Sequence, residues 1–296
     1  MLAHVPDPVV MGVVNVTPDS FSDGGEWLDP QAAIARGRDL VAQGAVILDV
    51  GGESTRPGAE PVGEAEELRR VLPVLEGLAD AGVRLSIDTS KAAVAAAALD
   101  AGATIVNDVT ALRGDVRMAA VVAERGCVVC LMHMLGEPRT MQLDPRYDDV
   151  VDEVRAFLAA RLEHAIAHGI DEQRVWLDPG IGFGKTIDHN LELLARLDEI
   201  VALGRPVVVG TSRKSFLGTI TGRDAHDRVA GTIATNVLAL ARGASVFRVH
   251  DVAEAHDALA VAAATLRGRW APATTTTSTS RSTTTTSTTK IASRPS

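Results

Sequence analysis

Leu177-Asp178-Pro179-Gly180-Ile181-Gly182-Phe183-Gly184-Lys185 is the stretch around which this chain is organised. It continues a short apolar run, Val175-Trp176-Leu177, that is typical of a buried strand. Asp178 ends the strand, Pro179 stops it, and the alternating glycines let the backbone turn tightly and approach a ligand. Parallel sheets and barrels place ligand sites at the carboxyl ends of their strands, so this loop is a candidate site. An ordinary strand-to-helix turn is the alternative interpretation.

Two common phosphate-binding motifs fail here on spacing. A P-loop ending at Gly184-Lys185-Thr186 would need a glycine where the chain has Pro179. A dinucleotide-binding loop needs Gly-x-Gly-x-x-Gly, whereas this loop reads Gly-x-Gly-x-Gly. The loop therefore calls for another function.

The composition points to a buried parallel sheet. Of 296 residues, 46% are apolar but only 3% are aromatic, so Val, Ile, Leu and Ala must build the core. The net charge of -9 argues against nucleic acid or an anionic membrane as a partner. No apolar run approaches the roughly 18 residues of a membrane span, and no secretory signal is visible. Cys127 and Cys130 lie in one β-like run and point to opposite faces, which favours buried thiols and a cytoplasmic protein.

A strand-loop-helix unit recurs along the chain. The predicted strands are Val9–Asn15, Val46–Val50, Leu85–Asp88, Thr104–Asp108, Val128–Met132, Val175–Asp178, Val207–Gly210 and Val246–Val249. The predicted helices lie near 31–43, 64–79, 91–100, 115–125, 149–168, 188–203, 227–242 and 253–267. This number of units predicts an α/β fold, a (β/α)₈ TIM barrel formed by residues 1–270 as a single domain. A doubly wound sheet is the alternative, and the Ser/Thr-rich residues 271–296 are expected to be a disordered tail.

Polar side chains end almost every predicted strand. In chain order they are Asn15, Asp49, Asp88, Asn107 with Asp108, His133, Asp178, Ser212 with Arg213 and Lys214, and Arg248, His250 and Asp251. A single Asp or Asn there is often only a helix cap. Because burying many polar groups is costly unless a partner satisfies them, their coincidence at one rim indicates a binding site. The long loops at residues 17–25 and 51–58 are expected to bind or cover the ligand.

Several of these segments resemble one enzyme family. Asn15-Val16-Thr17-Pro18-Asp19-Ser20-Phe21-Ser22-Asp23-Gly24-Gly25 and Gly51-Gly52-Glu53-Ser54-Thr55-Arg56-Pro57-Gly58 are similar to the first two signatures of the dihydropteroate synthases of folate biosynthesis. The later motifs of that pterin-binding family match in order at Ile87-Asp88-Thr89, Asn107-Asp108-Val109, Asp178–Lys185, Ser212-Arg213-Lys214 and Arg248-Val249-His250-Asp251. The resemblance covers residues 8–268 and leaves the tail without a counterpart.

The resemblance implies a transferase with a barrel fold. Family members join the diphosphate of 6-hydroxymethyl-7,8-dihydropterin to 4-aminobenzoate, giving 7,8-dihydropteroate and diphosphate in tetrahydrofolate biosynthesis. The electron-rich dihydropterin can stabilise a carbocation at its exocyclic methylene, so an SN1-like displacement without a strong general base is expected. The resemblance further implies a Mg²⁺ cofactor, inhibition by sulfonamides and a homodimer formed through the late helices, near Ala230–Ala241 and Ala258–Leu266.

The resemblance also implies a role for individual residues. Asp88, Asn107 and Asp178 would accept hydrogen bonds from the pterin edge, because carboxylates and amides suit its N–H donors. Lys214 would hold the pterin carbonyl and ring nitrogens, and Arg248 would stack on the heterocycle. The remaining assignments are Asn15 as the protein ligand of Mg²⁺, His250 beside the diphosphate, Asp23 near the developing cation, Thr55 and Arg56 ordering the second loop, and Phe21, Pro57, Phe183 and Ser215 around 4-aminobenzoate.

Two other functions remain open at this point. Methyltetrahydrofolate–corrinoid methyltransferases share the barrel and the pterin-reading carboxylates, but have no use for the Ser-Thr-Arg-Pro or Ser-Arg-Lys segments. A catalytically silent pterin-binding paralogue should have lost some residues of the first two loops, and this chain retains them.

Overall fold

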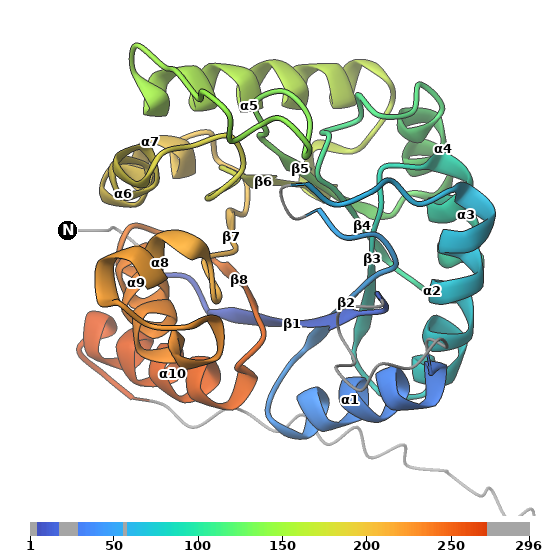
Figure 1. The fold of residues 1–296 in the computed structure, drawn as a ribbon, viewed down its shortest axis with the longest axis horizontal. Helices are drawn as coiled ribbons and strands as arrows, with labels where there is room; N and C mark the ends of the chain where they lie inside the picture. The colour runs from blue at the N-terminus through green and yellow to red at the C-terminus, as the bar shows by residue number, and fades with distance from the viewer. Residues whose placement is uncertain (1–4, 18–28, 56–57, 271–296) are drawn as a thin grey trace, which may run out of the picture.

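The computed structural model describes residues 5–17, 29–55 and 58–270 (Figure 1). Four of the predicted site residues, Phe21, Asp23, Arg56 and Pro57, lie outside the described residues, as does the predicted tail at 271–296. Within the described ranges, no helix is long and apolar enough to span a membrane.

The strands form one parallel sheet that curls into a nearly closed barrel (Figure 1). The strands are β1 (Val9–Asn15), β2 (Ile47–Gly51), β3 (Arg84–Asp88), β4 (Ile105–Asp108), β5 (Val128–Met132), β6 (Val175–Asp178), β7 (Val208–Val209) and β8 (Val246–Val249). Their order is β6-β5-β4-β3-β2-β1-β8-β7. A bridge between Leu177 and Val207 joins the two ends, supported by a 3.0 Å hydrogen bond from Leu177 N to Pro206 O. The predicted TIM barrel is confirmed, and the doubly wound alternative is wrong.

Helices cover the outside of the barrel (Figure 1). They are α1 (Pro30–Ala42), α2 (Glu64–Leu78), α3 (Ala92–Asp100), α4 (Met118–Arg125), α5 (Val150–Ala167), α6 (Ile187–Ala195), α7 (Leu197–Val201), α8 (Ser215–Thr221), α9 (Val229–Ala241) and α10 (Val252–Arg267), with 3₁₀ turns at Glu172–Arg174 and Ala225–Asp227. Each predicted helix has a counterpart, and short helix α8 was not expected. The helix predicted at 188–203 is two helices, because Arg196 leaves helical geometry (φ -111°, ψ 24°) where its guanidinium binds Asp149, Glu192 and Glu199.

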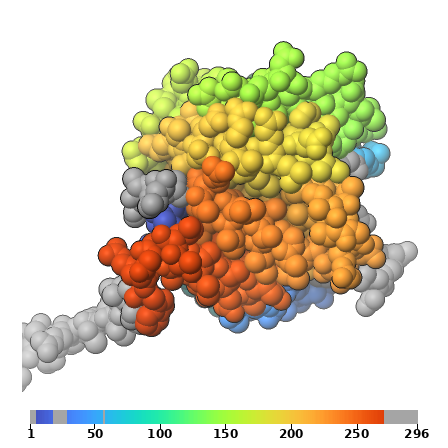
Figure 2. All heavy atoms as spheres, turned by 90° about the vertical axis from the view of Figure 1, so that its left-hand side faces the viewer, coloured from blue at the N-terminus to red at the C-terminus, as the bar shows by residue number. Residues whose placement is uncertain are grey.

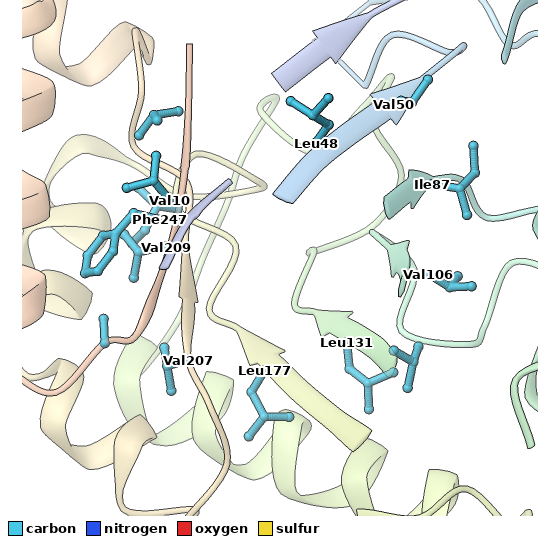
Figure 3. Close-up of a cluster of buried hydrophobic side chains, with 14 of the residues drawn as sticks. Val10, Leu48, Val50, Ile87, Val106, Leu131, Leu177, Val207, Val209 and Phe247 are labelled. Carbon is cyan, nitrogen blue, oxygen red and sulfur yellow. The ribbon is translucent and has the colours of Figure 1, made fainter. Parts of the chain in front are cut away.

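The side chains of the strands alternate between two environments, as the period of a strand requires. One set faces the helices and forms the main core; Figure 3 labels Val10, Leu48, Val50, Ile87, Val106, Leu131, Leu177, Val207, Val209 and Phe247 in it. The other set forms a separate inner apolar layer of Met11, Ile47, Ile105, Val128, Cys130, Trp176, Val208 and Val246. Towards the carboxyl ends of the strands, polar residues take over the inward positions.

Candidate active site

Strand register gathers the polar residues at the carboxyl end of the barrel. Asp49 on β2 pairs in register with Ser86 on β3, and Asp88 on β3 pairs with Asn107 on β4. Asp49 and Ser86 are fully buried, and Asn107 is almost fully buried. The Asp49 carboxylate accepts hydrogen bonds from Ser86 Oγ at 2.6 Å and from Asn107 Nδ2 at 3.1 Å. The sequence placed Asp49 at a strand end but assigned it no role in the site, whereas the structure makes it the buried centre of this network.

Arg248 enters the same network from β8, on the other side of the chain's first strand. Its Nε donates to Asp49 at 2.6 Å, and an Nη donates to Asp88 at 2.8 Å. The two carboxylates raise the pKa of Arg248 against the opposing effect of burial, so the guanidinium stays charged. Burial, opposed by Arg248, raises the pKa of Asp88 to about 7. Charge-assisted pairs of this kind hold a planar guanidinium in a fixed orientation.

The glycine loop after β6 folds against the end of β5. Asp178 lies in register with Met132, and its Oδ1 accepts a 2.6 Å hydrogen bond from Gly180 N. Gly180 has a φ of +66°, and a Cβ built there would lie 1.8 Å from the His133 carbonyl oxygen. Only glycine allows this approach. Burial raises the pKa of Asp178, while the charges of Lys214 and Arg248 oppose that shift, so both cations lie near this carboxylate.

Lys214 reaches the glycine loop from the start of α8. Its Nζ donates to the carbonyl of Ile181 and lies 4.7 Å from the centre of the Phe183 ring, a cation–π distance. Gly182 leaves room for this side chain, because a Cβ there would lie 3.0 Å from Lys214 Cδ. Burial lowers the pKa of Lys214 to about 8, against the effect of Asp178. Phe183 packs with Val109, Met132, Met134 and Met141.

A buried lysine–histidine pair also contacts the backbone of the glycine loop. Lys185 is 3% exposed, and its Nζ lies 2.9 Å from His133 Nδ1 and 3.0 Å from the Phe183 carbonyl oxygen, to which it donates. Burial lowers the pKa of both groups, that of His133 to about 2, so the imidazole is neutral. This pairing could not be predicted from the sequence, because the two residues are 52 positions apart in the chain.

The loop after β7 binds the loop after β8. Ser212 Oγ lies 3.1 Å from the backbone nitrogen of His250 and 3.0 Å from its Nδ1. Arg213, which has a φ of +59°, forms an ion pair with Asp251. The predicted residue Ser215 is exposed at the first position of α8, next to Lys214. The structure therefore brings the predicted Ser-Arg-Lys and Arg-Val-His-Asp segments together.

Not every polar strand end belongs to the site. Asp108 accepts hydrogen bonds from the backbone nitrogens of Thr110 and Leu112, both at 2.8 Å, and from Thr110 Oγ1 at 2.6 Å. These bonds cap the turn that follows β4, which is the common structural role of such an aspartate.

An ion-pair network holds the base of the second long loop. Lys91 bridges Glu53 and Glu67, with a distance of 2.5 Å to Glu67, which is fully buried. Glu53 Oε1 also accepts a 3.2 Å hydrogen bond from Val62 N. Glu53 thereby draws both ends of the loop together, and Thr55 is half-buried within it.

The amide oxygen of Asn15, at the end of β1, suits a hard cation that keeps most of its coordinated water. Asn15 is the half-buried last residue of β1, in register with Gly51. Within residues 5–17, 29–55 and 58–270, no group of three or more His, Cys, Asp or Glu side chains is arranged as a metal site. An amide oxygen alone would fit Mg²⁺, which usually takes one or two protein ligands together with waters and phosphate oxygens.

Comparison with known proteins gives a consistent result. A family model described as pterin binding enzyme matches residues 11–250. A dihydropteroate synthase of Neisseria meningitidis serogroup C is 49% identical over 258 residues, which is 85% of this chain and 90% of that protein.

Two solved structures share both the fold and the sequence pattern. The dihydropteroate synthase of Yersinia pestis in a sulfonamide drug complex is 45% identical, with a TM-score of 0.84 over 88% of this chain and 94% of that one. The enzyme of Xanthomonas albilineans with 4-aminobenzoic acid is 50% identical, with a TM-score of 0.82 over 87% of this chain and 92% of that one. The resemblance seen in the sequence motifs is thus confirmed, and the chain belongs to the dihydropteroate synthase family of pterin-binding enzymes.

Proposed function

We propose that the chain condenses the diphosphate of 6-hydroxymethyl-7,8-dihydropterin with 4-aminobenzoate, as a transferase of tetrahydrofolate biosynthesis, at the carboxyl end of its barrel. The observation that carries this proposal is the convergence of acceptors from β2, β3, β4 and β6 with the cations Arg248 and Lys214, directly above the inner apolar layer. The relative from Neisseria meningitidis serogroup C, of which the chain covers 90%, is a dihydropteroate synthase.

The acceptors suit the pterin ring. Asp88, Asn107 and Asp178 would accept hydrogen bonds from the 2-amino pyrimidinone edge, whose N–H groups need acceptors in a dry pocket. Lys214 would donate to the carbonyl and ring nitrogens on the other edge. Because Asp49 and Asp88 fix the guanidinium of Arg248, it can stack on the flat heterocycle with little loss of side-chain entropy.

The diphosphate would lie beside Arg248 and His250, where Ser212 fixes the imidazole. Asn15 would hold Mg²⁺ through its amide oxygen, and the ion would supply electrostatic stabilisation of the negative charge on the departing group. Asp23 would lie near the positive charge at the methylene, and Thr55 and Arg56 would close the second loop over the substrates. The displacement would be SN1-like, with the aniline nitrogen attacking as it stands, so it needs no nucleophile from the protein.

We place 4-aminobenzoate near Phe183, with Ser215, Phe21 and Pro57 shaping the pocket. The Phe183 ring contacts Lys214 and packs against buried methionines. The relatives from Yersinia pestis and Xanthomonas albilineans have been solved with a sulfonamide and with 4-aminobenzoic acid, respectively. Sulfonamides should therefore compete with 4-aminobenzoate, and a non-competitive pattern in inhibition kinetics would contradict this placement.

Diphosphate release tests the reaction directly. Purified protein should release diphosphate only when both substrates and Mg²⁺ are present, and Lys214→Ala should abolish the release. Lys290→Ala, the same substitution in the 271–296 segment, should leave the rate unchanged. Tight pterin binding without any release would instead identify a silent pterin-binding protein.

A homodimer through the late helices is the assembly we propose. A surface groove of about 690 Å³ between α9 and α10 is lined largely by apolar side chains, among them Val237, Ala258 and Val261, and these helices face the viewer in Figure 2. Val261 is 68% exposed and Leu238 is 61% exposed. Burying such groups against a second copy would be favourable. Light scattering should give a dimer for the parent chain and a monomer for Val261→Glu; a dimer unaffected by this change would place the interface elsewhere.

A cytoplasmic location agrees with the state of the cysteines. Cys127 and Cys130 are free and buried, and burial raises the pKa of Cys127 to about 11. Thiols persist in a reducing compartment. Cell fractionation would test this proposal.

A further inference from the structure

A polar pocket lies at the opposite end of the barrel from the proposed active site. It has a volume of about 280 Å³ and lies where β3, β4 and β5 begin. Its lining consists of Arg84, Leu99, Ala103, Thr104, Arg125, Gly126, Cys127 and Arg174. Three of these residues are arginines and none is acidic, although the chain as a whole carries a net charge of -9.

Acidic side chains neutralise only part of the positive charge of these arginines. Arg125 forms an ion pair with Asp100. In the described part of the chain, Arg84 and Arg174 form no ion pair: Arg84 Nε donates to Thr104 Oγ1 at 3.3 Å, and Arg174 donates to the Gly126 carbonyl. Burial and the positive charge of Arg174 both lower the pKa of Arg84, so the two guanidiniums are close enough to repel. An anion between them would relieve that repulsion.

The arginines are exposed, and each is restrained by a contact with the protein. The Arg84 guanidinium carbon lies 5.5 Å from the centre of the Trp176 ring, and Trp176 belongs to the inner apolar layer. Arg174 is tied to the end of α4 through Gly126, and Arg125 to the end of α3 through Asp100. Because these partners restrict the side chains, an anion would cost little further ordering of the arginines on binding.

We propose that this pocket binds a phosphate-bearing anion, independently of the proposed active site. The guanidinium fork matches the oxygens of a phosphate group, and several arginines together favour an anion with more than one negative charge. The volume equals that of roughly nine water molecules, which admits free phosphate or the phosphate end of a small metabolite.

Calorimetric titration with inorganic phosphate tests the proposal. The parent protein and Arg248→Gln, in which the proposed catalytic site is impaired, should both bind phosphate at the arginine pocket. Arg84→Gln/Arg174→Gln should weaken this binding by about tenfold or more, because two of the three guanidiniums of the pocket are lost. The double variant should keep its kcat and KM, because the pocket lies at the far end of the barrel.

Two control variants distinguish phosphate binding at this pocket from a general effect of the protein's positive charge. Arg38→Gln/Arg242→Gln removes the same charge from two exposed ion pairs and should leave phosphate binding intact. Arg84→Lys/Arg174→Lys keeps the charge and should bind better than the glutamine variant, which guards against misfolding as the cause. Ribose 5-phosphate binding more tightly than phosphate would identify a metabolite as the ligand, and equal binding would identify the free anion. Unchanged phosphate binding in Arg84→Gln/Arg174→Gln would overturn the proposal.

Discussion

Replacing Asp49 with asparagine should damage both stability and activity. Three donors converge on this fully buried carboxylate, from Ser86, Asn107 and Arg248. An asparagine has one acceptor oxygen and would turn its NH₂ group towards at least one of these donors. A buried donor without a partner costs about 1–3 kcal/mol, and a lost bond to a charged group about 1.5–3 kcal/mol.

The second ion pair of Arg248, with Asp88, limits the loss of stability in Asp49→Asn. Its bond to Asp88 at 2.8 Å survives, so the guanidinium is not left without an acidic partner. We therefore expect Asp49→Asn to lower the free energy of unfolding by about 2–4 kcal/mol, rather than by the full 3–5 kcal/mol of a broken buried pair. Because Arg248 loses its fixed orientation, kcat/KM should also fall about 10- to 100-fold, equivalent to about 1.4–2.7 kcal/mol.

Urea unfolding followed by circular dichroism, together with steady-state kinetics, would measure both effects. Asp198→Asn is the matched control, because Asp198 also pairs with an arginine, at 3.2 Å, but is half exposed. An exposed pair of this kind contributes about 0–1 kcal/mol. If Asp49→Asn were as stable and as active as Asp198→Asn, the network around Arg248 would have neither of the roles proposed for it.

Two further predictions follow from the same site. Asp88 must lose its proton to offer both oxygens as charged acceptors, and Lys214 must keep its own to donate as a cation, so kcat/KM should rise with pH through about 7 and fall above about 8; a flat profile across this range would count against the roles of both groups. Gly180→Ala should destabilise the fold by about 3 kcal/mol or more, because its Cβ would clash with the His133 carbonyl oxygen, whereas Gly126→Ala, also at positive φ but in open space, should cost about 1 kcal/mol in thermal or urea unfolding.

The barrel was predictable from local patterns, and its irregularities were not. Val9–Asn15 and Val128–Met132 have the predicted bounds, because continuous β-branched runs mark strands buried on both faces. Residues 207–210 were predicted as a full strand, but only Val208–Val209 pairs as one, at the point where the barrel closes. Helix α8 escaped prediction because its sequence, Ser-Phe-Leu-Gly-Thr-Ile-Thr, is rich in poor helix formers and depends on the burial of Phe216 and Leu217.

The candidate site was predictable as a set of residues but not as a set of contacts. Strand ends of a parallel barrel meet at one rim, so Asp88, Asn107 and Arg248 were expected to be neighbours. The sequence could not show which carboxylate would hold Arg248, because Asp49 lies 199 positions away. It also could not separate Asp108, which caps a turn, from the aspartates that face the site. Whether an aspartate pairs with Arg248 or caps a turn depends on the direction of its side chain and on the strands beside it, and a local sequence pattern contains neither.

The division of the barrel interior explains how the chain tolerates so polar a rim. The main core between the sheet and the helices includes residues from every strand, and the inner apolar layer closes the barrel beneath the site. Burial of these side chains at about 25 cal/mol per Å² supplies the stability that the charged groups above them reduce. Asp49 and Arg248 can therefore remain paired and oriented in the absence of substrate, and electrostatic catalysis needs groups that are oriented before the reaction begins.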